Sequence, residues 1–218
     1  MNKWLVEGVI FKHPFTCMLA GPTGAGKTVL IKKILLYKDI IIEPIPERIV
    51  YCYKSWQPAY DEMLSTANTP IEFNQGLFNI DLFDKNKNNL LIIDDLMNEC
   101  ENSSEIKQLF AVDSHHNNIS VFLITQNIFS KGKCARDISL NSHYIIIFNS
   151  PRDMNQIGTL GRQMYPDSSK FFLESYKDAT FNGHGYLFID LKQKTEEKNR
   201  IQTGIIPGEL RIIYTKKD

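Results

Sequence analysis

The stretch Gly21-Pro22-Thr23-Gly24-Ala25-Gly26-Lys27-Thr28 decides the fold of this chain, because it fits the pattern G-x-x-x-x-G-K-[ST] at every fixed position. The apolar, β-prone segment 15–20 precedes it, and residues 29–36 follow with apolar side chains at helical spacing. In a strand, glycine turn and helix of this order, backbone N–H groups surround phosphate oxygens and the helix dipole favours the anion. We therefore interpret residues 21–28 as a binding loop for a nucleoside triphosphate rather than a glycine-rich turn with a chance lysine.

Two side chains of this loop have distinct expected roles. Lys27 would reach the β- and γ-phosphates, and the hydroxyl of Thr28 would coordinate Mg²⁺. The other residues of the loop would bind phosphate through the backbone: Gly21, Pro22, Thr23, Gly24, Ala25 and Gly26. The expected cofactors are therefore ATP and Mg²⁺.

A second segment, Asn89-Leu90-Leu91-Ile92-Ile93-Asp94-Asp95, ends an aliphatic run with two acids. Such a run is typical of a parallel strand that helices cover on both faces, and ligands bind at the carboxyl ends of such strands. We expect Asp94 to hold the metal through water and Asp95 to act as the general base on the attacking water. Alternatively, both aspartates cap a solvated turn.

A third apolar run, residues 119–125, ends in the polar pair Gln126-Asn127. Additional-strand ATPases insert a strand between the phosphate-loop strand and the acid-bearing strand, with a polar side chain at its tip facing the γ-phosphate. Gln126 is our candidate for this sensor, because an amide can donate to phosphate and accept from water. The alternative is an amide that caps the next loop.

The remaining pattern predicts an α/β fold with a mostly parallel central sheet flanked by helices. Further strands are expected at 48–53, 144–148, 185–190 and, as a possible edge strand, 210–214. Helices are expected at 103–116, 153–165 and 167–176, and a short helix plus a loop within 55–76.

Composition is consistent with one compact domain, residues 1–218, because 43% of the residues are hydrophobic. The formal net charge is zero, so any DNA contact must come from a local patch. The four cysteines, Cys17, Cys52, Cys100 and Cys134, have no metal-binding spacing, and we expect reduced thiols. We expect neither a signal peptide nor a membrane span, and therefore a soluble protein that is not secreted.

Several motifs together resemble the packaging ATPases of the FtsK–HerA superfamily. They are Asp94–Glu99, His115–Ser120 leading to Thr125-Gln126-Asn127, Ser139–Tyr144 and Ser150–Asp153. Within that superfamily, the chain most resembles the branch with the poxvirus DNA-packaging ATPase and its relatives in Maverick/Polinton elements, adintoviruses and virophages. The resemblance runs from about Phe11 to about Pro207, nearly the whole chain.

This resemblance implies a P-loop, RecA-like ATPase that moves double-stranded DNA into a viral capsid. It implies a homo-oligomeric ring of five or six subunits, capsid vertex proteins as partners, and a place in the host nucleus or at a cytoplasmic viral assembly site. The second acid of the superfamily is usually glutamate, whereas this chain has Asp95. Glu99 is therefore an alternative base.

Ring ATPases of this type usually complete the site with an arginine from the neighbouring subunit, which can contribute ~10³–10⁵ in rate in GTPases. Arg136, Arg152 and Arg162 follow the sensor strand, and Arg152 and Arg136 are the leading candidates. Each could instead be a surface charge or pair with a nearby aspartate. The basic cluster Lys131–Arg136 is a candidate DNA loop, although solvated surface is the commoner role of such clusters.

Two classes of function remain open on the sequence alone. The first is an enzyme, either a DNA-translocating ATPase or a P-loop phosphotransferase. The second is a nucleotide-switched protein that docks to a capsid vertex and turns over little. The fold alone does not choose among them.

Overall fold

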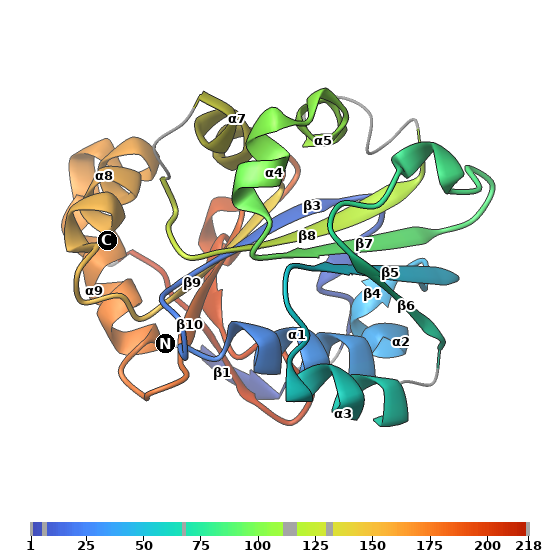
Figure 1. Ribbon diagram of the computed structural model, residues 1–218. Helices are drawn as coiled ribbons and strands as arrows, with labels where there is room; N and C mark the ends of the chain where they lie inside the picture. Colours follow the sequence, from blue (N-terminus) through green and yellow to red (C-terminus); the bar gives the residue numbers. More distant parts are fainter. Residues whose placement is uncertain (1, 6–7, 67–68, 111–116, 130–132, 217–218) are drawn as a thin grey trace.

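The structure is a computed structural model that describes residues 2–5, 8–66, 69–110, 117–129 and 133–216. For residues 2–5, 66, 101–102 and 133–136 it describes the backbone alone. Most of the described strands form one large sheet, and helices lie on both of its faces (Figure 1).

The central part of the sheet is parallel. Its strands, in spatial order, are β9 (Tyr144–Phe148), β3 (Thr16–Ala20), β8 (Ile119–Thr125), β7 (Asn89–Asp94), β5 (Arg48–Tyr53) and β6 (Ile71–Gln75). Every residue of β3, β7, β8 and β9 is buried. Continuous apolar runs form such strands because both faces of a parallel sheet must be covered.

Beyond β9 the sheet continues antiparallel. The strands there are β10 (Tyr186–Asp190), β11 (Ile201–Thr203), β12 (Leu210–Ile213) and β1 (Asn2–Leu5). A separate parallel pair consists of β2 (Phe11–Lys12) and β4 (Ile42–Glu43). Short 3-10 helices lie at Ile80–Leu82, Pro166–Ser168 and Glu197–Asn199.

Three groups of helices cover the sheet (Figure 1). Below it in this view lie α1 (Lys27–Leu36), α2 (Lys38–Ile41) and α3 (Pro58–Thr66). Above it lie α4 (Met97–Asn102), α5 (Ser104–Gln108) and α7 (Lys133–Asn141). At the left are α8 (Met154–Met164) and α9 (Ser169–Ala179).

Alternate residues of the central strands belong to different cores. On β8, for example, Phe122 and Ile124 pack with the α1–α3 side, whereas Val121 and Leu123 pack with the α4–α7 side. This alternation follows from the two-residue period of a strand.

The predicted α/β fold is confirmed, and so is the inserted strand: β8 lies between the phosphate-loop strand β3 and the acid-bearing strand β7. The helix pair broken at Pro166 is also confirmed, as α8 and α9.

The helix predicted from residue 103 is confirmed at its start, because Ser103 is the N-cap of α5, but α5 ends at Gln108 and the preceding helix α4 was not predicted. Helix α4 begins at Met97, one residue beyond the acid pair. The helical run breaks at Ser103, whose hydroxyl accepts a hydrogen bond from the Ile106 N–H and caps α5. A serine favours such a cap because its oxygen satisfies an amide at the helix start. Residues 111–116 lie outside the described part.

The predicted edge strand was also misplaced. Strand β12 lies inside the sheet between β11 and β1, so β1 and β6 form the two edges of the described sheet. Strand β6 lies in the region 55–76, where we expected only a short helix and a loop.

Cys17, Cys52 and Cys100 are buried and form no disulfide bond with the described residues. Burial raises the pKa of the Cys17 thiol and raises that of Cys52 to about 11. The side chain of Cys134 is outside the described part. No helix among the described residues has the length and apolarity that a membrane crossing requires.

Two glycines of α8 provide a matched test of the α8–α9 contact. A Cβ at Gly161 would lie 2.9 Å from Cδ1 of Phe172 on α9, whereas a Cβ at Gly158 would meet only the Arg162 side chain at 3.5 Å. We expect Gly161→Ala to lower the free energy of unfolding by about 1–3 kcal/mol through overpacking. Gly158→Ala should raise it by about 0.5–1 kcal/mol through the helix propensity of alanine. The urea midpoints of unfolding of the two variants measure these changes in stability. Equal stabilisation by the two substitutions would contradict the close packing of Gly161 against Phe172.

Candidate nucleotide site

The loop 21–26 connects the end of β3 to the start of α1, as the glycine pattern predicts. Gly26 precedes the helix with φ 104°, a left-handed conformation that favours glycine. Gly21 donates its N–H to the Thr125 carbonyl at 3.2 Å, which ties the loop to the tip of β8. The first turn of α1 contains no acidic residue, so its N-terminal dipole is available to an anion.

Lys27 lies folded across the loop. Its Nζ donates to the carbonyl oxygens of Gly21 at 2.5 Å and Pro22 at 2.8 Å. Burial lowers the pKa of Lys27, while the negative charges of Asp94 and Asp95 act in the opposite direction. Lys27 and both acids line one cleft.

Asp94 is the last residue of β7 and is 5% exposed. Its Oδ2 accepts hydrogen bonds from the hydroxyls of Tyr51 at 2.7 Å and Tyr60 at 3.0 Å. Burial raises the pKa of Asp94, and these two hydrogen bonds oppose that rise because they stabilise the charged carboxylate.

Asp95 follows with φ 56°, in the left-handed region that aspartate tolerates better than most residues. Unlike Asp94, it is exposed. Its Oδ1 accepts from Nε2 of Gln126 at 3.3 Å. The expected base and the expected sensor therefore meet at the tips of neighbouring strands.

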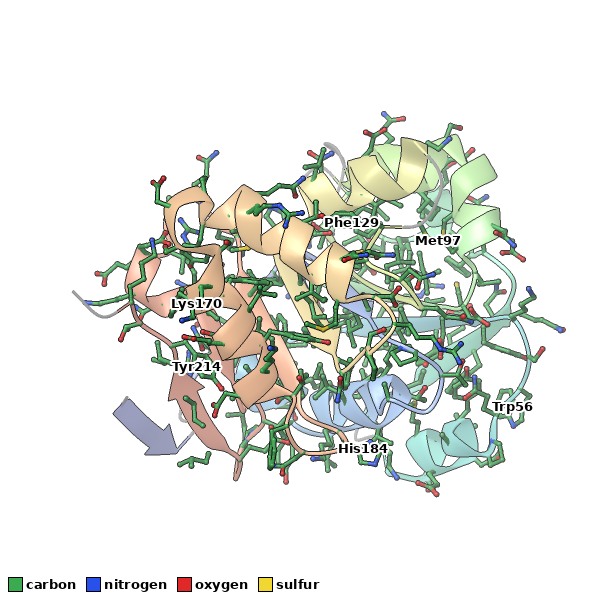
Figure 2. The ribbon with its side chains drawn as sticks, turned by 90° about the vertical axis from the view of Figure 1, so that its left-hand side faces the viewer. Trp56, Met97, Phe129, Lys170, His184 and Tyr214 are labelled. Carbon is green, nitrogen blue, oxygen red and sulfur yellow. The ribbon has the colours of Figure 1, made fainter. Side chains whose placement is uncertain are left out.

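Both residues line a cleft of ≈ 290 Å³ that also includes Lys27, Thr28 and Asp94. Further lining residues are Thr23, Gly24, Gly26, Val29, Gln57, Ile124, Thr125 and His184. In Figure 2, His184 lies beside helix α1, and its Nδ1 is 3.4 Å from the Ala25 carbonyl oxygen.

Glu99, the alternative base, lies on α4 and does not line this cleft. Its side chain is partly buried, and its Oε2 makes no hydrogen bond with the described residues. The geometry therefore favours Asp95 over Glu99 as the residue next to an attacking water.

The oxygen donors present fit a magnesium ion. The Asp94 carboxylate and the Thr28 hydroxyl line the same cleft, and both phenol bonds to Asp94 go to Oδ2 rather than Oδ1. Carboxylate and hydroxyl oxygens together with water and phosphate are the ligands that Mg²⁺ prefers. Among the described residues, no cluster of three His, Cys, Asp or Glu side chains suggests a different metal site.

Two of the candidate arginines, Arg152 and Arg162, do not line the cleft. Arg152 is exposed in the turn after β9, and no described residue forms an ion pair with it. The nearby Asp153 instead accepts from the Ser150 hydroxyl at 2.6 Å. Arg162 is exposed on α8 and donates to the Thr159 hydroxyl at 3.0 Å.

The basic cluster Lys131–Arg136 falls largely outside the described part. Residues 131–132 are not described, and the backbone of Lys133–Arg136 belongs to α7. That part of the cluster is therefore helical, whereas we expected a loop. The side chain of Arg136 is not described.

Sequence reasoning missed Tyr51, Tyr60, Gln57 and His184. Tyr51 occupies a strand that we predicted, but nothing in its local sequence indicates that its hydroxyl meets Asp94. Tyr60 and Gln57 lie in a region to which we assigned only an unspecified short helix. His184 reaches the loop from 159 residues away in sequence, and no pattern in its neighbourhood indicates this contact.

No protein-family model and no curated protein sequence matches this chain. Among solved structures, it is similar to B204, the DNA-packaging ATPase of Sulfolobus turreted icosahedral virus, with TM-score 0.55 and 16% identity over 84% of this chain and 96% of that chain. The genome packaging NTPase B204 of Sulfolobus turreted icosahedral virus 2 in complex with AMPPCP gives TM-score 0.55 and 15% identity over 84% and 95%. At these identities the likeness establishes the fold, which is that of a P-loop NTPase.

Proposed function

We propose that this protein is a Mg²⁺-dependent ATPase that translocates double-stranded DNA and packages a viral or virus-like genome into a capsid. The observation that carries the hydrolase part is the hydrogen bond between Gln126 and Asp95 in the cleft that holds Lys27. The DNA part rests on the motif resemblance and on the shared fold with a DNA-packaging ATPase.

In this proposal the phosphate loop, the two acids and the sensor have different roles. Backbone amides of residues 21–28 bind the phosphates, and Lys27 leaves the carbonyls of its own loop to neutralise the β- and γ-phosphate oxygens. Bound Mg²⁺, held by Thr28 and by Asp94 through water, would neutralise charge that develops on the phosphates. Asp95 accepts a proton from the attacking water, and Gln126 holds Asp95 while its amide faces the γ-phosphate.

Residue placement favours hydrolysis over the other two functions. A phosphotransferase needs an acceptor pocket, whereas the hydrogen-bonded carboxylate and amide that line this cleft would suit the positioning of an attacking water. A switch with little turnover does not require a base beside a sensor. We further propose that residues 1–218 form a single ATPase domain of the poxvirus-like branch, which acts at an intracellular assembly site with capsid vertex proteins as partners.

Duplex DNA should increase the rate of ATP hydrolysis. Because the net charge is zero, the DNA contact must be local and involve few phosphates, so the stimulation should decrease with rising salt with a shallow slope. Phosphate release with and without duplex DNA, at several salt concentrations, measures this effect. Lys27→Ala is the control that should release no phosphate in either condition. Slow, DNA-independent turnover would favour the assembly protein, and phosphate transfer to a small acceptor would favour the phosphotransferase.

We also propose that the site is completed by an arginine from a neighbouring subunit in a ring of five or six. The exposed position of Arg152 at the carboxyl edge of the sheet, without an ion pair among the described residues, leaves its charge available to a neighbouring subunit. A contact of this kind is head-to-tail and closes into a ring when the rotation permits.

Mixing two inactive variants tests this arrangement. Lys27→Ala subunits mixed with Arg152→Ala subunits should regain part of the ATPase activity, because some interfaces then join an intact loop to an intact arginine. The matched control is the double variant Lys27→Ala/Arg152→Ala mixed with Lys27→Ala, which should stay inactive. Restoration with Arg136→Ala but not with Arg152→Ala would identify the rival arginine, and full activity of a monomeric sample would contradict an arginine in trans.

A further inference from the structure

We infer that Tyr51 and Tyr60 are positioning residues that fix the orientation of the Asp94 carboxylate for the metal, and that Tyr60 thereby links helix α3 to the occupancy of the metal site. This inference rests on the proposed nucleotide-binding function. It concerns hydroxyl groups that donate to Asp94 from two tyrosines that do not line the nucleotide cleft.

The two hydrogen bonds distinguish between the two oxygens of the Asp94 carboxylate. Both hydroxyls donate to the same atom, Oδ2 of Asp94, at 2.7 Å from Tyr51 and 3.0 Å from Tyr60. Two donors on one oxygen restrict rotation of the carboxylate about its terminal torsion, which is otherwise broad. The oxygen Oδ1 is therefore the one left for a ligand in the cleft.

The two tyrosines come from separate elements and support each other. Tyr51 lies on β5, the strand next to β7, and Tyr60 lies on α3. Both residues are fully buried, and their ring centroids are 5.0 Å apart. Phe73 of β6 packs on both rings, at 5.2 Å from Tyr51 and 5.4 Å from Tyr60. Neither hydroxyl can move far from Asp94 while this packing holds.

Helix α3 connects this contact to the surface. Gln57, directly before the helix, lines the nucleotide cleft. Trp56 packs edge-on against Tyr60 with centroids 5.5 Å apart, and its indole N–H is 3.4 Å from a carboxylate oxygen of Asp61. Trp56 is 46% exposed, and Figure 2 shows it at the periphery of the molecule beside α3. A shift of Asp94 when the metal binds would therefore be transmitted through Tyr60 to Trp56.

A Tyr→Phe substitution removes the hydroxyl and keeps the ring, so it tests the positioning role of a tyrosine without removing its packing. The probe is the non-hydrolysable analogue AMPPCP, titrated by calorimetry at a series of Mg²⁺ concentrations. We expect the double variant Tyr51→Phe/Tyr60→Phe to need about 10–100-fold more Mg²⁺ for half-maximal enhancement of AMPPCP binding, the usual effect of losing partners of a metal ligand. Binding of AMPPCP in the absence of Mg²⁺ should be unchanged.

Tyr53→Phe is the matched control. Tyr53 belongs to the same aromatic cluster, 5.7 Å from Tyr60, but no described interaction joins its hydroxyl to Asp94. It should retain the wild-type Mg²⁺ dependence. A double variant that folds, as judged by circular dichroism, and has the wild-type Mg²⁺ midpoint would overturn the positioning role. Wild-type protein that binds no AMPPCP at any Mg²⁺ concentration would instead overturn the nucleotide site, and with it this inference.

Fluorescence of Trp56 tests the link to α3. The chain has two tryptophans, so a Trp4→Phe background isolates the Trp56 signal. Addition of Mg²⁺ to the AMPPCP complex should change the Trp56 emission, and Tyr60→Phe should reduce that change more than Tyr51→Phe, because only Tyr60 belongs to α3. An emission that does not respond to Mg²⁺, or that responds equally in both variants, would contradict the link.

Discussion

The proposed site depends on the buried carboxylate of Asp94 at the end of β7. A buried carboxylate is costly unless hydrogen bonds or an opposite charge compensate it. Here two phenol hydroxyls donate to it, and Lys27 supplies positive charge from across the cleft. These partners come from β5, α3 and α1, so the packing of three elements around β7 and the charge state of the site depend on each other.

The strand order of the sheet brings the proposed sensor and the proposed base together. Because β8 is inserted between β3 and β7, its tip delivers Gln126 next to Asp95 and ties Thr125 to the start of the phosphate loop. The left-handed backbone at Asp95 separates the two acids: Asp94 remains buried among tyrosines, while Asp95 is exposed in the cleft. Adjacent residues of one motif thus acquire different environments, which suits the different tasks proposed for them.

The sequence predicted those parts of the fold whose signals are local. The phosphate loop, the buried strands and the pair α8–α9 follow from glycine spacing, apolar runs and a proline. The helix α4 and the strand β6 were missed because α4 begins without a capping side chain and because strand pairing depends on neighbours that a linear pattern does not identify. The same reason explains which site residues could be predicted. Lys27, Asp94 and Gln126 belong to sequence motifs, whereas Tyr60 contacts Asp94 and His184 contacts the loop only through tertiary packing.

The measurement that tests the central claim most directly compares two conservative carboxylate replacements, Asp95→Asn and Glu99→Gln, in ATP binding and in single-turnover hydrolysis. The account predicts that Asp95→Asn still binds ATP but hydrolyses it about 10²–10⁴-fold more slowly, the usual contribution of a general base, while Glu99→Gln hydrolyses it at nearly the wild-type rate. Loss of hydrolysis in Glu99→Gln together with normal turnover in Asp95→Asn would contradict the account.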